Sequence, residues 1–359
     1  MTSAVFTLES PRGWIHGRYT DLIVMLGPWL FLAFALGVWG HQQPSTALWT
    51  SQFVLGNTTH VILTFLLLAA RPEVLRATPS QPRLVIVGSL LTFLVAWSVF
   101  RGFDAYLPAW SGFPIAVAAI FGTHHRLSQA KGIWSLYNLR GRELRHAAPS
   151  ARERSMQQHW VSVGLVLVMV SWLFIPSGPE RMFPLLQAIP GEPAILPYEL
   201  AYGLVAGWLL FVAALLVELG RDRGANLPKM LHVGTHGAAV SFAIVSPVWG
   251  GIVWGTIHGL EYYFLCARMM KPREGDTARG PSAAWVWPLI GLSMLPLFLV
   301  GLPQSPLAAP LGISGSRLFH EALFVLNSLV MAHYFADAFI YRFRIPGVRE
   351  VALRRLGFS

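Results

Sequence analysis

Histidine and acidic side chains recur at helical spacing inside the apolar stretches of this 359-residue sequence. His232 and His236 are four residues apart, so both imidazoles project from one face of a helix, as two ligands of one metal ion do. His258 and Glu261 are three residues apart, which places an imidazole and a carboxylate on one face. These residue types at these spacings indicate metal binding.

A second imidazole and carboxylate, His333 and Asp337, are four residues apart near the C-terminus. A carboxylate at membrane depth costs at least about 2.5 kcal/mol, so Glu261 and Asp337 need a cation nearby, and their apolar stretches hold no Lys or Arg at comparable depth. We expect catalytic or bridging roles for Glu261, Asp337 and Tyr262. The expected metal ligands are His60, His124, His125, His159, His232, His236, His258, Glu261, His333 and Asp337.

The elements that must position these residues are membrane-spanning helices. Hydrophobic residues make up 54% of the chain and charged residues only 12%, about half the share usual in a soluble domain. This composition excludes a disordered chain, a fibrous repeat and an ordinary cytosolic enzyme. It predicts an all-α, polytopic integral membrane bundle in a single domain, 1–359. Its expected spans, about ten, are 20–40, 47–70, 82–100, 107–126, 158–176, 199–219, 230–248, 250–270, 283–303 and 317–341.

Charge predicts the orientation of these spans. With both termini in the cytoplasm, all Lys and Arg residues except Arg101, Arg181 and Arg317 fall on the cytoplasmic side, as the positive-inside rule requires. The net charge of +10 therefore reports orientation in a membrane, which we expect to be a bacterial inner membrane, and contact with anionic lipids; no motif points to nucleic acid. Segment 127–157 is the expected cytoplasmic loop, with a possible interfacial helix, and 177–198 the expected outside loop.

Depth along these spans brings the histidines into one layer. Counted from the cytoplasmic end of each span at 1.5 Å per residue, all eight predicted histidine ligands fall within about 18 Å. The single cysteine, Cys266, excludes a disulfide framework, a cysteine zinc knuckle and an iron–sulfur cluster.

Imidazole with a few carboxylates and no thiolate suits iron, zinc or copper, and this many nitrogens exceed the needs of one ion. We expect a non-haem di-iron oxidoreductase, an oxygenase, hydroxylase or desaturase, that activates O₂ in the cytoplasmic half of the bilayer. A lipophilic small molecule would enter from the membrane, and an acidic electron donor would bind the basic cytoplasmic face.

The motifs resemble those of His-rich integral-membrane non-haem iron enzymes, namely fatty-acid desaturases and hydroxylases and Brp/Blh-type carotene dioxygenases. The resemblance rests on His124-His125 with Gln129, on the HxxxH of His232 and His236, and on the cytoplasmic-side histidine layer. The HxxHH boxes usual in desaturases are missing, and ten spans exceed their usual four. The C-terminal run 333–342 resembles endings of uncharacterised bacterial membrane proteins.

Two other functions fit parts of the pattern. Haem needs axial histidines from facing helices, so the chain could be a haem-binding electron carrier or a haem-modifying protein. Chains of histidine and carboxylate also serve as relays in transporters of divalent metals or protons, and His320, Asn327, Tyr334 and Tyr341 share a stripe on the last span.

Overall fold

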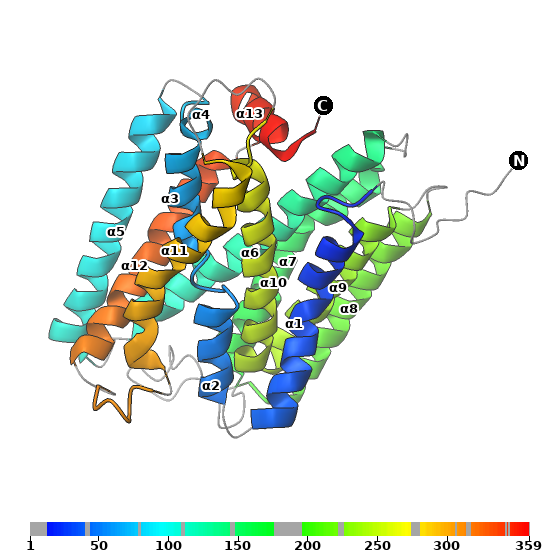
Figure 1. Ribbon diagram of the computed structural model, residues 1–359. Helices are drawn as coiled ribbons and strands as arrows, with labels where there is room; N and C mark the ends of the chain where they lie inside the picture. Colours follow the sequence, from blue (N-terminus) through cyan, green and yellow to red (C-terminus); the bar gives the residue numbers. More distant parts are fainter. Residues whose placement is uncertain are drawn as a thin grey trace, which may run out of the picture. The chain divides into compact units, whose positions relative to one another are not determined.

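The computed structural model describes residues 13–39, 44–77, 80–108, 112–143, 148–175, 196–221, 226–273, 281–305, 307–313, 317–341, 343 and 345–358. The described chain is helical and contains no strand, which confirms the all-α prediction for this part of the protein (Figure 1).

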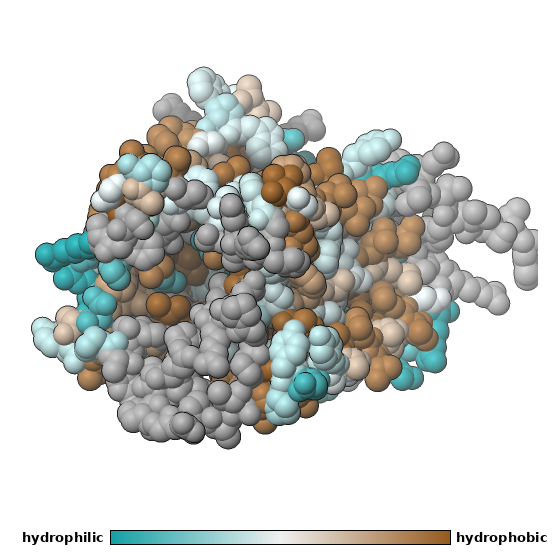
Figure 2. Space-filling view, turned by 90° about the horizontal axis from the view of Figure 1, so that it is seen from below, coloured by the Kyte–Doolittle hydropathy of each residue, from teal (hydrophilic) through white to brown (hydrophobic). Residues whose placement is uncertain are grey.

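Six helices of the described chain have the length and apolarity to cross a membrane, and each overlaps an expected span. They are α1 (Arg18–Trp39), α5 (Gln81–Tyr106), α7 (Ala151–Phe174), α8 (Glu199–Gly220), α11 (Ala283–Gly301) and α12 (Arg317–Ile340), the last over His320–Ile340. Their outward residues are apolar: Leu30, Leu210 and Leu292 are 72%, 73% and 66% exposed. Hydrophobic residues also cover large parts of the described surface in Figure 2. Such exposure fits contact with lipid, so the helices are compatible with a multi-pass membrane protein.

The count of ten spans is not confirmed. The expected span 47–70 is divided into α2 (Pro44–Trp49), the π-helix η1 (Thr50–Val54) and α3 (Val61–Ala70). Three more helices are long enough but carry polar and charged residues within their apolar stretches: α6 (Gly112–Glu143), α9 (Leu227–Val245) and α10 (Pro247–Met270). The expected orientation, with both termini in the cytoplasm of a bacterium, stays a prediction.

Helix α6 continues through much of the segment expected as the loop 127–157. Leu127, Ala130, Trp134 and Tyr137 are buried at intervals of three and four residues, so the helical period persists to Glu143 after the apolar run has ended. The next helix, α7, already begins at Ala151. Of the expected outside loop 177–198, residues 177–195 lie outside the described part.

The chain, expected as one domain, divides into two compact units, with α6 and α10 each contributing to both. Unit 1 comprises 1–42 and 122–258, and unit 2 comprises 43–121 and 259–359. In unit 1, α9 packs on α1, α7 and α8. Its core includes Trp134, Trp160 and Trp208, three fully buried indoles whose successive ring centroids are 4.6 and 4.5 Å apart.

Unit 2 is built around α12, which packs against α3, α5 and α11. Phe100 of α5 stacks on Phe324 of α12, and Gly88 of α5 approaches Phe335 of α12 so closely that an added Cβ would lie 2.2 Å from the ring. The short elements α4 (Pro72–Leu75), η3 (Leu302–Gln304) and α13 (Pro346–Leu356) complete the unit, and α4 packs on α13 (Figure 1). Helix α12 thereby carries His333 and Asp337 into the interior of unit 2.

Candidate metal centre

In unit 2, a sharp change of chain direction places His60 at the start of α3. The π-helix η1 ends at Val54, and Gly56 then takes a φ of 96°, a left-handed conformation that favours glycine. A Cβ at Gly56 would also lie 2.2 Å from the ring of Tyr263. His60 is 3% exposed, and its Nδ1 lies 3.1 Å from the carbonyl oxygen of Gly56. A carbonyl can only accept, so Nδ1 carries the proton of a neutral imidazole and Nε2 carries the lone pair.

His333 of α12 has the same tautomer for a different reason. Its Nδ1 lies 2.7 Å from the hydroxyl oxygen of Thr64, one turn after His60. Thr64 donates its single hydroxyl proton to Asp337 Oδ1 at 2.8 Å, so it accepts from His333 Nδ1. The lone pair of His333 therefore lies on Nε2, which is 3.5 Å from the other carboxylate oxygen, Asp337 Oδ2.

Tyr262 of α10 completes this group. Its hydroxyl donates to Asp337 Oδ1 at 2.7 Å and lies 2.5 Å from Thr64 Oγ1. Its ring centroid is 5.3 Å from that of His60 and also 5.3 Å from that of His333. Tyr262 is 1% exposed, so it shields the two imidazoles and holds the carboxylate in place.

The two imidazoles of unit 2 lie close enough to share one ion. The ring centroids of His60 and His333 are 5.0 Å apart, and each ring offers a nitrogen within 4.8 Å of one on the other. A metal-binding histidine usually donates its second ring N–H to a carbonyl or a carboxylate, directly or through a partner, and both histidines do so here. We call His60, His333, Asp337, Thr64 and Tyr262 the unit 2 centre.

Unit 1 brings together two other predicted pairs. The ring centroids of His125 on α6 and His258 on α10 are 5.0 Å apart, and those of His232 and His236 on α9 are 4.4 Å apart. In each pair, nitrogens of the two rings lie within 4.8 Å of one another. Each pair therefore has the spacing of two ligands of one ion.

The environment of His232 argues for a structural role. Trp134 donates its indole N–H to His232 Nδ1 at 2.8 Å. An indole can only donate, so a neutral His232 carries its proton on Nε2 and lacks a lone pair there for a metal. The ligand role of His232 stays a prediction, with this hydrogen bond against it.

The other predicted residues occupy different settings. His124 on α6 and His159 on α7 have exposed side chains. Glu261 is buried on α10, three residues after His258, but the division between the two units falls between them. Metal binding by these three residues stays a prediction.

Three residues of unit 2 were not among the predicted ligands or catalytic residues: Thr64, Cys266 and Tyr341, the last of which the sequence places only in the polar stripe of the final span. Each follows a predicted site residue by four positions, namely His60, Tyr262 and Asp337, and so lies on the same helix face. The helical repeat that linked the histidines could have found them.

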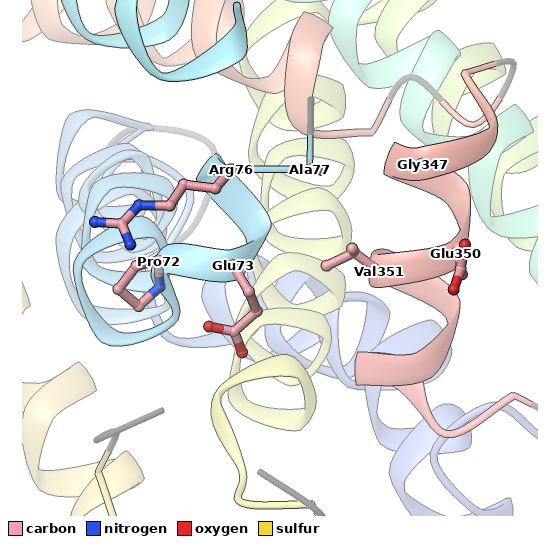
Figure 3. A pocket seen from close by; sticks show the side chains of 7 residues that line it. All are labelled: Pro72, Glu73, Arg76, Ala77, Gly347, Glu350 and Val351. Atoms are coloured by element: carbon pink, nitrogen blue, oxygen red, sulfur yellow. The ribbon is translucent and has the colours of Figure 1, made fainter. Parts of the chain in front are cut away.

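Two cavities in unit 2 lie away from the unit 2 centre. An apolar groove of about 410 Å³ is bordered by α5, the start of α6 and Met331 of α12. Met331 and His333 are roughly 200° apart around α12, so His333 lies on the other side of the helix from the groove. A second cleft, of about 430 Å³, lies between α4 and α13, with Glu73 and Arg76 on one wall and Glu350 and Val351 on the other (Figure 3).

Comparison with protein-family models, with curated proteins and with solved structures returned no match for this chain.

Proposed function

We propose that this protein is a membrane-embedded, metal-dependent oxidoreductase that binds iron and uses O₂ on a lipophilic substrate. The observation that carries the proposal is the pair of buried His60 and His333 rings, 5.0 Å apart, whose Nδ1 atoms each lie within hydrogen-bond distance of an accepting oxygen; from this we infer that both Nε2 lone pairs are left for an ion. A carboxylate, Asp337, lies within the same group. Imidazole with carboxylate and without thiolate favours iron, zinc or copper; iron and copper supply O₂ chemistry when bound, and iron is the ion we propose.

The residues of the unit 2 centre have separate roles in this proposal. His60 and His333 hold the ion, and the Gly56 carbonyl and Thr64 fix the orientation of their rings. Asp337 balances the charge of the ion. Tyr262 donates a hydrogen bond to that carboxylate and excludes water, since it is almost fully buried.

A second ion would bind in unit 1. His125 and His258 form the better pair there, because the Trp134 hydrogen bond argues against His232. Together the two units would hold about two iron ions per chain, as the sequence predicts.

The substrate and partners are proposed on general grounds. The exposed apolar surface gives a lipophilic molecule access from the bilayer, and the basic face suits anionic lipids and an acidic electron donor. Helix α13 contributes exposed Arg349 and Arg354 to that charge.

Haem fits the unit 2 centre less well. The two axial ligands of one haem lie on opposite faces of the porphyrin. A ring-centroid separation of 5.0 Å leaves no room for a porphyrin between His60 and His333.

Metal analysis and optical spectroscopy of the detergent-purified protein test the proposal. We expect about two iron ions per chain, no Soret band, and oxygen consumption when the reduced protein is mixed with O₂. Iron content should fall in the His258→Ala variant. His232→Ala distinguishes two readings of His232. The sequence predicts a large loss of iron, whereas the structural role indicated by Trp134 predicts that iron is retained. A Soret band, or zinc or copper in place of iron, would contradict the proposal.

A further inference from the structure

A line of polar side chains continues from the unit 2 centre to the end of α12. His333, Asp337 and Tyr341 follow one another at intervals of four residues on α12, and Tyr262 and Cys266 do so on α10. The rings of Tyr262 and Tyr341 are 6.0 Å apart, and Cys266 Sγ lies 3.9 Å from the Tyr341 hydroxyl. The two helices thus face each other along a polar seam, defined here as Tyr341, Cys266, Tyr262 and Asp337.

Two hydrogen bonds and a ring contact join the members of the seam. The Tyr341 hydroxyl lies within hydrogen-bond distance of Cys266 Sγ, and its ring meets that of Tyr262 edge-on. Tyr262 in turn donates to Asp337, which lies 3.5 Å from His333 Nε2. Tyr341, Cys266 and Tyr262 can each accept a proton on one side and release one on the other, because a hydroxyl and a thiol are both donors and acceptors, and the Asp337 carboxylate accepts.

The surroundings make this seam unusual. Cys266 is fully buried, and Tyr262 and Asp337 are 1% and 6% exposed. Helix packing would be served by apolar residues at these positions, and polar groups at membrane depth are expensive. Tyr341, in contrast, is only partly buried and follows the last residue of α12.

The outer end of the seam lies in a polar part of unit 2. Arg71 donates to the carbonyl of Met270, the last residue of α10, and Arg268 donates to the carbonyl of Leu356 in α13. Arg71, Met270 and Leu356 are themselves buried, so the member of the seam that is partly exposed is Tyr341. A chain of donors and acceptors thus runs from the partly exposed Tyr341 to Asp337, beside the proposed ion.

We propose that Tyr341, Cys266 and Tyr262 conduct protons from the end of α12 to Asp337, beside the proposed ion. This inference rests on the proposed function for its purpose. Insertion of one oxygen atom of O₂ into a C–H bond, with reduction of the other atom to water, takes two electrons from an external donor and two protons from solvent. Each hydroxyl or thiol accepts a proton on its oxygen or sulfur and passes its own proton inward.

The single cysteine provides a direct probe of this path. Its S–H stretch is the only one in the protein and falls in a clear window of the infrared spectrum, so transfer to D₂O reports exchange at the middle of the seam. We expect the thiol to exchange much faster than the backbone amides of α10. Tyr341→Phe should slow this exchange by about 100-fold, the lower end of what a positioned proton-transferring group contributes.

Tyr263→Phe is the matched control. It removes another buried tyrosine hydroxyl from α10, one that bonds to Thr59 at 2.5 Å and lies outside the seam, so thiol exchange should keep its wild-type rate. If the wild-type thiol exchanges no faster than the α10 amides, the proposal is overturned. Equal rates of thiol exchange in wild type and Tyr341→Phe would overturn it as well. Thiol exchange needs no metal, so it tests the proton path alone. The iron content tests the proposed function in a separate measurement.

Discussion

His333 donates from Nδ1 to Thr64 over 2.7 Å, and this contact sets which nitrogen of the imidazole can bind a metal. Thr64 lies on α3 and His333 on α12, and both are fully buried. Asp337 accepts a hydrogen bond from the Thr64 hydroxyl, and that hydroxyl in turn accepts one from His333. Asp337 thus orients the His333 imidazole through Thr64, whereas in many metal sites a carboxylate bonds to the histidine directly. Unit 2 therefore has a supporting shell as well as ligands.

Thr64→Val should weaken metal binding without removing a ligand. The variant keeps the shape of the side chain but leaves His333 Nδ1 without its acceptor, so we expect metal affinity to fall by about 10–100-fold. Competition with a chelator measures the metal affinity. Thr64→Ser keeps the hydroxyl and should therefore bind the metal with the wild-type affinity. Thr59→Val, which alters a threonine bonded to Tyr263, is the control. Equal losses in both valine variants would show that Thr64 acts only on packing.

Gly259→Ala should disturb the position of His60. A Cβ at Gly259 would lie 2.6 Å from the carbonyl oxygen of Gly56, and backbone atoms cannot yield as a flexible side chain can. We expect a loss of about 1–3 kcal/mol in stability, together with a lower metal affinity. Gly251→Ala is the control on the same helix, because a Cβ there meets nothing within 4 Å in the described structure. Thermal unfolding in detergent compares the two variants. Similar melting temperatures for Gly259→Ala and Gly251→Ala would contradict the close approach of Gly259 to the Gly56 carbonyl.

Lys229→Met should strongly destabilise unit 1. The Lys229 ammonium forms a buried ion pair with Glu153 and bonds to Asn138 at 2.6 Å. Removing one charge leaves the other buried without compensation, which costs about 3–5 kcal/mol. The double variant Lys229→Met/Glu153→Gln should lose less than the sum of the single variants, as a double-mutant cycle of unfolding free energies would show. Additive losses would mean that the two groups do not interact.

Trp134→Phe tests the structural reading of His232. The variant removes the hydrogen bond to His232 Nδ1 and should cost about 1–3 kcal/mol, because a buried acceptor loses its donor. We expect the iron content to stay at the wild-type level. A loss of iron as large as in His333→Ala would contradict this reading and favour His232 as a ligand.

Apolar length predicted six long apolar helices well, because a helix that is to lie in lipid must be continuous and hydrophobic. It was misleading for 47–70, where η1 and the left-handed Gly56 interrupt a stretch that is apolar in sequence. Apolar length also predicted that the helix at 107–126 ends too early. Residues 127–137 continue α6 because they bury one face of the helix while the other face carries polar groups.

Helical spacing predicted His333 with Asp337 and His232 with His236, since these pairs are local. The tautomer of His333 depends on Thr64, which is 269 positions away in sequence. The indole that bonds His232 is likewise distant in sequence, and only packing reveals it.

Iron bound per chain in the His60→Ala and His333→Ala variants tests the central claim most directly. Elemental analysis of folded, detergent-purified protein should show iron in the wild type and a large loss in both variants. His320→Ala, at an exposed position on the same helix as His333, should retain the wild-type content. A wild-type protein without iron, or iron unchanged in both variants, would contradict the unit 2 centre as a metal site.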